Sequence, residues 1–82
     1  MKYEIRYESR SIKYLKRLDN DTQLRILKAI NGLPSGDVKK LQGSLEDYRL
    51  RVGSYRILFS KDDNVLTINI LDIAPRGGAY KK

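Results

Sequence analysis

The chain has 82 residues, with 17 lysines and arginines against 10 aspartates and glutamates, no histidine and no cysteine, and a formal net charge of +7. The missing histidine and cysteine exclude a Ser–His–acid triad, a thiolate nucleophile and zinc sites built on either residue, so no metal or cofactor is expected. The positive charge indicates an acidic partner, with nucleic acid ahead of an acidic protein and an anionic membrane surface.

The beginning of the chain predicts a strand that leads into a helix. Apolar residues alternate with charged ones over residues 3–7, the period of two that is typical of a strand with one buried face. A helix is predicted to follow, capped by Ser9 or Ser11, with an apolar stripe that runs to Leu18.

A second helix is predicted over residues 22–31, directly after a break at Asn20 and Asp21 that offers a cap. Its apolar residues recur at helical spacing, and Gly32 stands where a left-handed C-cap belongs. The two helices are therefore expected to form a hairpin.

The second half of the chain predicts three strands after a loop over residues 33–45. Turn-forming residues at Gly53–Ser54 and at 62–64 separate these strands. The last strand is apolar on both faces, which favours a central position in the sheet. The predicted strands cover residues 48–52, 55–60 and 65–73.

This order, β-α-α-β-β-β, predicts an α+β fold in a single domain of residues 1–82. The helical hairpin is expected to pack on one face of a mostly antiparallel four-stranded sheet. Charged residues begin at Lys2, and no apolar stretch has the length of a signal-peptide core or a membrane-spanning helix. We therefore expect a cytoplasmic protein with no membrane partner.

Arginines recur on two neighbouring predicted strands. Arg49 and Arg51 point to one face of their strand because side chains alternate with a period of two. The short turn that follows allows Arg56 to share that face. Three guanidinium groups packed together repel one another, which indicates an anionic partner between them. The alternative is a solvated strand face on which the arginines pair with acids such as Glu46 and Asp47.

Further candidate contacts lie on either side of these strands. Arg76 can bind a phosphate in bidentate fashion, and Tyr80 can stack on an RNA base from a glycine-rich loop. The alternative is a C-terminal loop without a role. Lys39 and Lys40 lie in the predicted loop before Arg49, where they either contact phosphate or are simply solvated.

Three segments carry a family resemblance that extends over essentially the whole chain. They are Leu41-Gln42-Gly43, Tyr-Arg-Leu-Arg-Val-Gly-Ser-Tyr-Arg at 48–56, and Asp-Ile-Ala-Pro-Arg-Gly-Gly-Ala-Tyr at 72–80. With the element order, they resemble the RelE/ParE toxin superfamily of bacterial and archaeal toxin–antitoxin systems. The chain is more similar to the RelE branch, which cleaves messenger RNA in the decoding site of the ribosome, than to the ParE branch, which poisons DNA gyrase. It departs from the best-known RelE enzymes by carrying arginine where they carry lysine on the basic strand.

The resemblance implies catalytic roles for four residues. Arg51 and Arg56 are expected to stabilise the phosphorane that forms during RNA cleavage. Arg76 is expected to stabilise or protonate the leaving oxygen, and Tyr80 to orient a nucleobase by stacking. Because arginine is a poor base, the group that deprotonates the 2′-hydroxyl stays open between Arg51, Tyr80 and the ribosome with its water. Further RNA contacts are expected from Arg49, Lys39, Lys40 and Lys81.

The resemblance also implies partners: a cognate antitoxin, messenger RNA in the ribosomal A site, and the ribosome itself. An antitoxin segment is expected to mask the positive face, and an apolar groove beside the helical hairpin is a candidate dock for it. Three other functions stay open. They are a ParE-like gyrase inhibitor without RNase activity, a basic RNA-binding module without catalysis, and a degenerate toxin that retains antitoxin binding alone.

Overall fold

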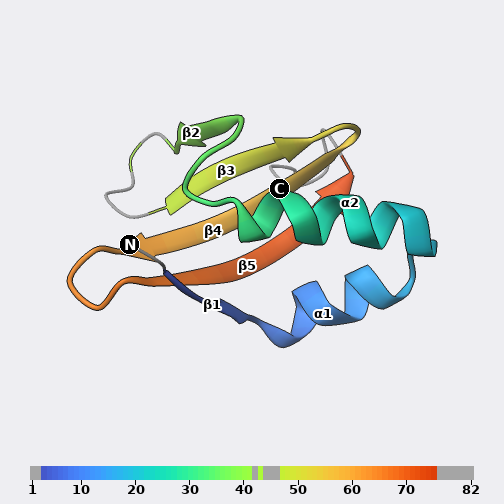
Figure 1. Ribbon diagram of the computed structural model, residues 1–82, viewed down its shortest axis with the longest axis horizontal. Helices are drawn as coiled ribbons and strands as arrows, with labels where there is room; N and C mark the ends of the chain where they lie inside the picture. Colours follow the sequence, from blue (N-terminus) through green and yellow to red (C-terminus); the bar gives the residue numbers. More distant parts are fainter. Residues whose placement is uncertain (1–2, 42, 44–46, 76–82) are drawn as a thin grey trace.

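In the computed structural model, the described residues are 3–41, 43 and 47–75, and they form two helices and a five-stranded sheet (Figure 1). The strand order is β1-β5-β4-β3-β2, with β1 parallel to β5 and the other pairs antiparallel. The predicted α+β fold is confirmed. The last strand, β5, lies between β1 and β4, so it is an interior strand, but the central position that we predicted for it is occupied by β4. The elements are β1 (Glu4–Tyr7), α1 (Ser9–Lys16), α2 (Asn20–Asn31), β2 (Val38–Lys40), β3 (Asp47–Val52), β4 (Tyr55–Asp62) and β5 (Thr67–Pro75).

The sheet has five strands rather than the predicted four, because Val38–Lys40 forms the short edge strand β2. We expected this segment to belong to a loop, and that prediction was wrong. The strand is antiparallel to β3 and sets Lys39 opposite Arg49. Three residues are too few for an alternation pattern to be read, and their pairing depends on the backbone groups that the edge of β3 offers.

The first helix begins at Ser9, and its N-cap is Glu8 rather than either serine, so the predicted cap was wrong. Ser11 is instead fully buried. Its hydroxyl donates to the Glu8 carbonyl at 2.7 Å and to the Ile70 carbonyl of β5 at 3.5 Å. The small side chain therefore lets α1 lie close to β5, and its hydroxyl fastens the helix to the sheet.

The second helix begins two residues before its predicted start, because Asp19 caps it. The Asp19 carboxylate accepts hydrogen bonds from the Thr22 hydroxyl at 2.6 Å and the Thr22 backbone N–H at 3.2 Å. These hydrogen bonds hold the pKa of Asp19 below its usual value. Gly32 ends the helix with φ −86°, a right-handed conformation, so the predicted left-handed cap was wrong.

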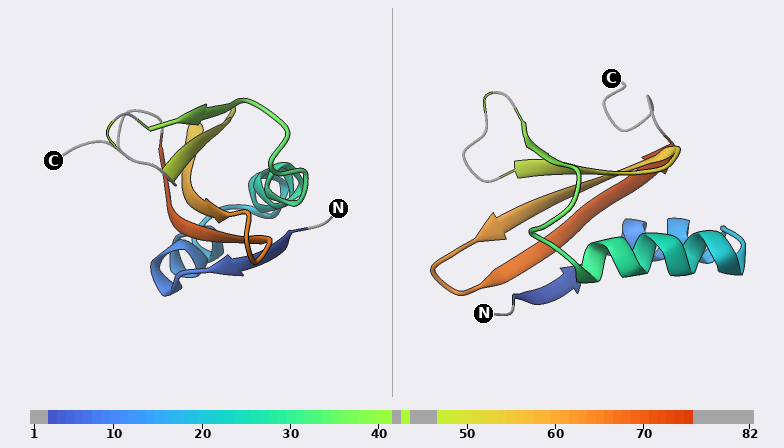
Figure 2. Two further views of the ribbon diagram at one scale, coloured as in Figure 1. Left: turned by 90° about the vertical axis from the view of Figure 1, so that its left-hand side faces the viewer. Right: turned by 45° about the horizontal axis from the view of Figure 1, so that its top comes forward.

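Both helices pack on the same face of the sheet (Figure 2). No helix of the described residues covers the opposite side, which we call the open face. Within that part of the chain, neither helix combines the length and the apolar character that crossing a membrane requires. The core between helices and sheet consists of Leu15, Ile26, Ile30, Leu33, Leu50, Val52, Ile57, Phe59, Ile68, Ile70 and Ile73.

A β-bulge at Leu71 shifts the register between β5 and β4. Ile70 faces the core, and a strict period of two would place Asp72 there as well. Because the bulge adds one residue, Ile73 is the next buried side chain and Asp72 lies on the open face, opposite Leu58.

The first strand is fastened to the β4–β5 turn by Tyr3, Lys61 and Asp63, which we call the clamp. The Tyr3 hydroxyl and the Lys61 ammonium both donate to the Asp63 carboxylate, the latter at 3.1 Å. The ammonium also lies 5.8 Å from the ring centre of Tyr3 and 5.5 Å from that of Tyr48. The hydrogen bonds from Tyr3 and Lys61 hold the pKa of Asp63 below its ordinary value of 3.8.

Replacing Phe59 by alanine should remove the largest fully buried side chain of the sheet. The ring also stacks on Tyr48, with ring centres 5.5 Å apart. We expect the free energy of unfolding to fall by about 3–5 kcal/mol, the usual cost of an emptied aromatic site. Urea denaturation followed by circular dichroism measures it. Val65→Ala, at a side chain that is 65% exposed, is the control and should change the value by less than about 0.5 kcal/mol.

Replacing Asp63 by asparagine should make stability less dependent on pH. Since folding lowers the pKa of Asp63, its ionised carboxylate stabilises the fold at pH values above 3.8, and this contribution is lost as the pH falls through the folded-state pKa. The melting temperature of Asp63→Asn should therefore lie below that of the natural protein at neutral pH, and the two should converge in acid. A difference that stays constant down to the acid range would contradict a role for the ionised carboxylate.

Candidate nucleic-acid interface

Three arginines lie together on the open face, near the hairpin that joins β3 and β4. Arg51 of β3 is directly opposite Arg56 of β4, and Arg49 lies two residues from Arg51 on the same side of β3. The register thus agrees with the expectation that the three share one face, which we call the arginine face. Residues directly opposite in an antiparallel pair have Cβ atoms about 4.5–5.5 Å apart, so Arg51 and Arg56 are close neighbours.

The neighbouring strands extend this face on both sides. On one side, Lys39 of β2 lies opposite Arg49. On the other side, Ala74 of β5 lies opposite Arg56, and Asp72 lies two residues before Ala74 along β5. The arginine face is therefore bordered by a further cation on β2 and by a carboxylate on β5.

Arg49 is unusually buried for a cation, with 8% of its surface exposed. Its Nη1 atom lies 3.7 Å from a carboxylate oxygen of Asp37, close enough for an ion pair but too far for a hydrogen bond. Among the described residues, neither this atom nor the buried Nε of Arg51 has a hydrogen-bond partner. Buried N–H groups without partners are costly, and an anion between these side chains would satisfy them.

The two lysines before the basic strand separate in the structure. Both are exposed on β2, but only Lys39 lies on the open face beside Arg49. Lys40 is opposite Tyr48, whose ring packs against the core on the other side of the sheet. The structure thus brings Lys39 to the arginines and not Lys40.

Three expected site residues, Arg76, Tyr80 and Lys81, lie outside the described residues. Two acids that were not singled out from the sequence lie beside the arginines instead. Asp37 precedes β2, and its backbone carbonyl accepts a hydrogen bond from the Arg51 N–H at 3.0 Å. If β2 had been predicted from the sequence, the alternation of side chains would have placed Asp37 on the same face as Lys39, two residues away. Side-chain alternation gave no such signal for Asp72, because the bulge at Leu71 moves its side chain to the face opposite the one that alternation predicts.

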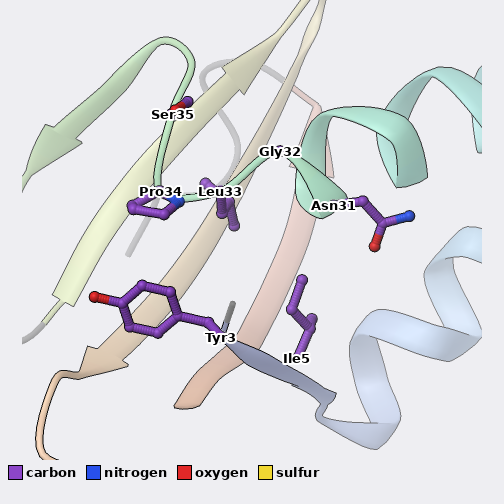
Figure 3. Close-up of a pocket in the computed structure, with 7 residues that line it drawn as sticks. All are labelled: Tyr3, Ile5, Asn31, Gly32, Leu33, Pro34 and Ser35. Atoms are coloured by element: carbon purple, nitrogen blue, oxygen red, sulfur yellow. The ribbon is translucent and has the colours of Figure 1, made fainter. Parts of the chain in front are cut away.

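A cavity lies elsewhere, between β1 and the connection from α2 to β2 (Figure 3). It has a volume of about 570 Å³. None of the arginines lines it, so it offers no site for phosphate chemistry. It does lie beside the helical hairpin, where we expected a groove. Its lining residues are Tyr3, Ile5, Asn31, Gly32, Leu33, Pro34 and Ser35.

Comparison with known proteins places this arrangement in a family. No family model matches the chain. A protein of Methanocaldococcus jannaschii assigned as the toxin RelE1 is 32% identical over 90 aligned positions, which cover 99% of this chain and 98% of the relative. The chain belongs to the RelE toxin family. The resemblance seen in the sequence is therefore confirmed.

Solved structures agree with the RelE assignment. The RelE–RelB complex of Pyrococcus horikoshii OT3 contains a chain that is 30% identical, with a TM-score of 0.80 and coverage of 95% of this chain and 99% of that one. The RelB–RelE complex of Methanococcus jannaschii gives 26% identity, a TM-score of 0.72 and coverage of 92% and 94%. The overall fold of this RelE-family protein is thus that of its relatives.

Replacing Arg51 by glutamine should stabilise this RelE-family protein at low salt. The change removes the like-charge repulsion with Arg56 directly opposite, and we expect the free energy of unfolding to rise by about 0.5 kcal/mol. The gain should fade near 1 M salt, where the Debye length is only about 3 Å. Urea denaturation at both salt concentrations measures it, with Lys13→Gln on the exposed side of α1 as the matched loss of charge. A loss of stability that is equal at both concentrations would mean that repulsion is not the dominant effect.

Proposed function

We propose that this RelE-family protein is the toxin of a type II toxin–antitoxin pair, an endoribonuclease that cleaves messenger RNA in the ribosomal A site and so inhibits translation. The observation that carries the proposal is the direct pairing of Arg51 with Arg56 on the open face, beside Arg49. Cations held opposite each other cost stability. An RNA phosphate bound between them would remove that cost.

The reaction requires an RNA 2′-hydroxyl to attack the adjacent phosphorus, which passes through a crowded anionic phosphorane. Arg51 and Arg56 stabilise this phosphorane, because guanidinium groups match phosphate oxygens in bidentate geometry and stay charged. Preorganised donors of this kind usually supply a large share of the rate enhancement. Arg49, held by Asp37, and Lys39 beside it bind neighbouring phosphates.

Residues beyond β5 complete the proposed site. Arg76 is bonded to Pro75, the last residue of β5, whose partner across the sheet is Tyr55, the residue before Arg56. In this proposal, Arg76 stabilises the leaving 5′-oxygen and Tyr80 stacks on a nucleobase. Lys40 and Lys81 contribute further contacts to the RNA or to the ribosome.

A cognate antitoxin is the proposed partner that silences this activity. The RelE chains of Pyrococcus horikoshii and Methanococcus jannaschii were solved in complexes with RelB. The net charge of +7 suits an acidic partner, and the cavity beside β1 offers a place for one of its apolar segments. Binding of such a partner over the arginine face would compete directly with RNA.

Mapping of RNA ends in a translating extract tests the proposed function. The protein should produce new 5′ ends within codons of a translated message, and none on the same RNA when ribosomes are omitted. A parallel supercoiling assay with purified gyrase covers the ParE-like alternative. Gyrase inhibition without new RNA ends would overturn the proposal, and so would binding of free RNA with a steep salt dependence but no cleavage.

The double variant Arg56→Ala with Arg76→Ala should lose cleavage. Removing one donor to a developing anion typically costs about 10²–10³ in rate, so the pair should cost about 10³ or more. Single-turnover cleavage on programmed ribosomes measures the effect. The double variant Lys13→Ala with Lys16→Ala removes the same charge from exposed positions of α1 and should retain the natural rate. Full cleavage by the arginine variant would show that these side chains do not stabilise the transition state.

A further inference from the structure

The arginine face lacks a group that can accept the proton of the 2′-hydroxyl. Guanidinium groups remain protonated at neutral pH, and the chain has no histidine. A carboxylate is the remaining side chain that is an ionised acceptor at neutral pH. A base for this reaction would be a carboxylate on the open face that lies within reach of the arginines without being bound by them.

Asp72 meets this requirement through its place in the sheet. It lies two residues before Ala74, the partner of Arg56, and is therefore the diagonal neighbour of Arg56 on the open face. Diagonal neighbours on adjacent strands are about 7–8 Å apart, a separation that one nucleotide can bridge. The Asp72 side chain is 30% exposed, so its carboxylate is accessible from solvent.

The bulge at Leu71 is the second observation that points to Asp72. Without it, the alternation along β5 would place Asp72 in the core, where an ionised carboxylate has no place. Bulges are frequent next to active sites because they re-aim a side chain. Here the bulge directs a carboxylate to the side of the sheet that carries the three arginines.

The other described acids near the open face are less suitable. Asp37 is held by Arg49 at 3.7 Å. Asp47 is four residues from Arg51 along β3, about 13 Å at the rise of a strand, and Asp62 is six residues from Arg56, about 20 Å. Among the described acids, Asp72 is the one that lies beside the paired arginines without being held by an arginine of this face.

We propose that Asp72 is the general base of the cleavage reaction, a role that rests on the proposed function. The Asp72 carboxylate accepts the proton of the 2′-hydroxyl while the 2′-oxygen forms its bond to phosphorus. The bond from phosphorus to the 5′-oxygen then breaks, and the leaving oxygen takes a proton from water. The products are a 2′,3′-cyclic phosphate and a 5′-hydroxyl end. No water is consumed, and Asp72 returns its proton to solvent.

A structural role for Asp72 makes a different prediction, because its carboxylate also lies 4.0 Å from Arg10 Nη1 of α1. Arg10 is 75% exposed, and an exposed pair at this distance contributes little stability. Arg10→Gln removes this ion pair and leaves the carboxylate in place. It is therefore the matched control for Asp72→Asn, which removes the charge and keeps the shape of the side chain.

Single-turnover cleavage on programmed ribosomes, measured from about pH 6 to 8.5, tests the proposal. Carboxylates stay ionised over this range, so the natural protein should give a nearly flat profile.

The rate of Asp72→Asn should fall by about 10²–10⁴, and the residual rate should rise tenfold per pH unit as hydroxide replaces the lost base. Asp72→Glu should be slower than the natural protein and keep the flat profile, whereas Arg10→Gln should match the natural rate. Among the described residues, the charged groups that face Asp72 are Arg10 from α1 and Arg56 from β4, while Arg6 of β1 lies beside Asn69.

The possible outcomes separate this inference from the proposed function. Absence of cleavage by the natural protein would overturn the proposed function itself. If the natural protein cleaves and Asp72→Asn cleaves equally fast with the same pH profile, only the role of Asp72 is overturned. An equal loss in Asp72→Asn and Arg10→Gln would assign the effect to the ion pair and also overturn it. Thermal melting of each variant shows whether it is folded. If Asp72→Asn does not fold, the pH profile of Asp72→Glu decides whether Asp72 is the general base.

Discussion

The two-residue turn at Gly53 and Ser54 fixes which side chains of β3 and β4 lie opposite each other. Gly53 has φ +56°, in the left-handed region that glycine adopts without strain, and Val52 pairs with Tyr55 across the turn. One residue more or fewer in the turn would move every side chain of β4 to the other face. The pairing of Arg51 with Arg56, and every contact built on it, depends on this turn.

The like charges of Arg51 and Arg56 destabilise the fold, and contacts elsewhere in the sheet offset this cost. Apolar packing on the reverse side of the sheet holds the two strands in register, because Leu50 and the opposite Ile57 are both fully buried there. Asp37 partly offsets the charge of Arg49 without forming a hydrogen bond to its buried Nη1. The core thus supplies the stability that the arginine face costs, as expected of a surface selected for binding an anion rather than for folding.

Side-chain alternation made much of this fold predictable, and departures from it account for the errors. The strict alternation around Arg49 and Arg51 predicted their shared face, since every second residue of β3 is apolar. The same reasoning failed for β2, whose three residues carry no pattern, and for Ser11, which is polar by type but buried because a small side chain is needed beside β5. The predicted left-handed cap at Gly32 was wrong because a glycine after a helix permits such a cap without requiring one.

The candidate site was predictable for the same reason, and only where strands are regular. Arg49, Arg51 and Arg56 follow from strand periodicity together with the turn. Asp72 does not, because one extra residue at Leu71 reverses the face of everything after it, and a bulge has no reliable signal in a single sequence. In a site that combines regular strands with a bulge, the sequence therefore predicts the positions of the side chains on the regular strands but not of those after the bulge.

A site without histidine has to keep its cations and its base apart. A carboxylate in contact with an arginine neutralises both groups, as the position of Asp37 against Arg49 illustrates. Asp72 instead lies at the position diagonal to Arg56, and such positions are about 7–8 Å apart on adjacent strands. With Lys39, the cations of this face still outnumber its two nearby carboxylates, so the surface attracts RNA while holding an acceptor at its border. In the proposed mechanism, spatial separation within one sheet gives arginine and aspartate two functions that a single imidazole could otherwise combine.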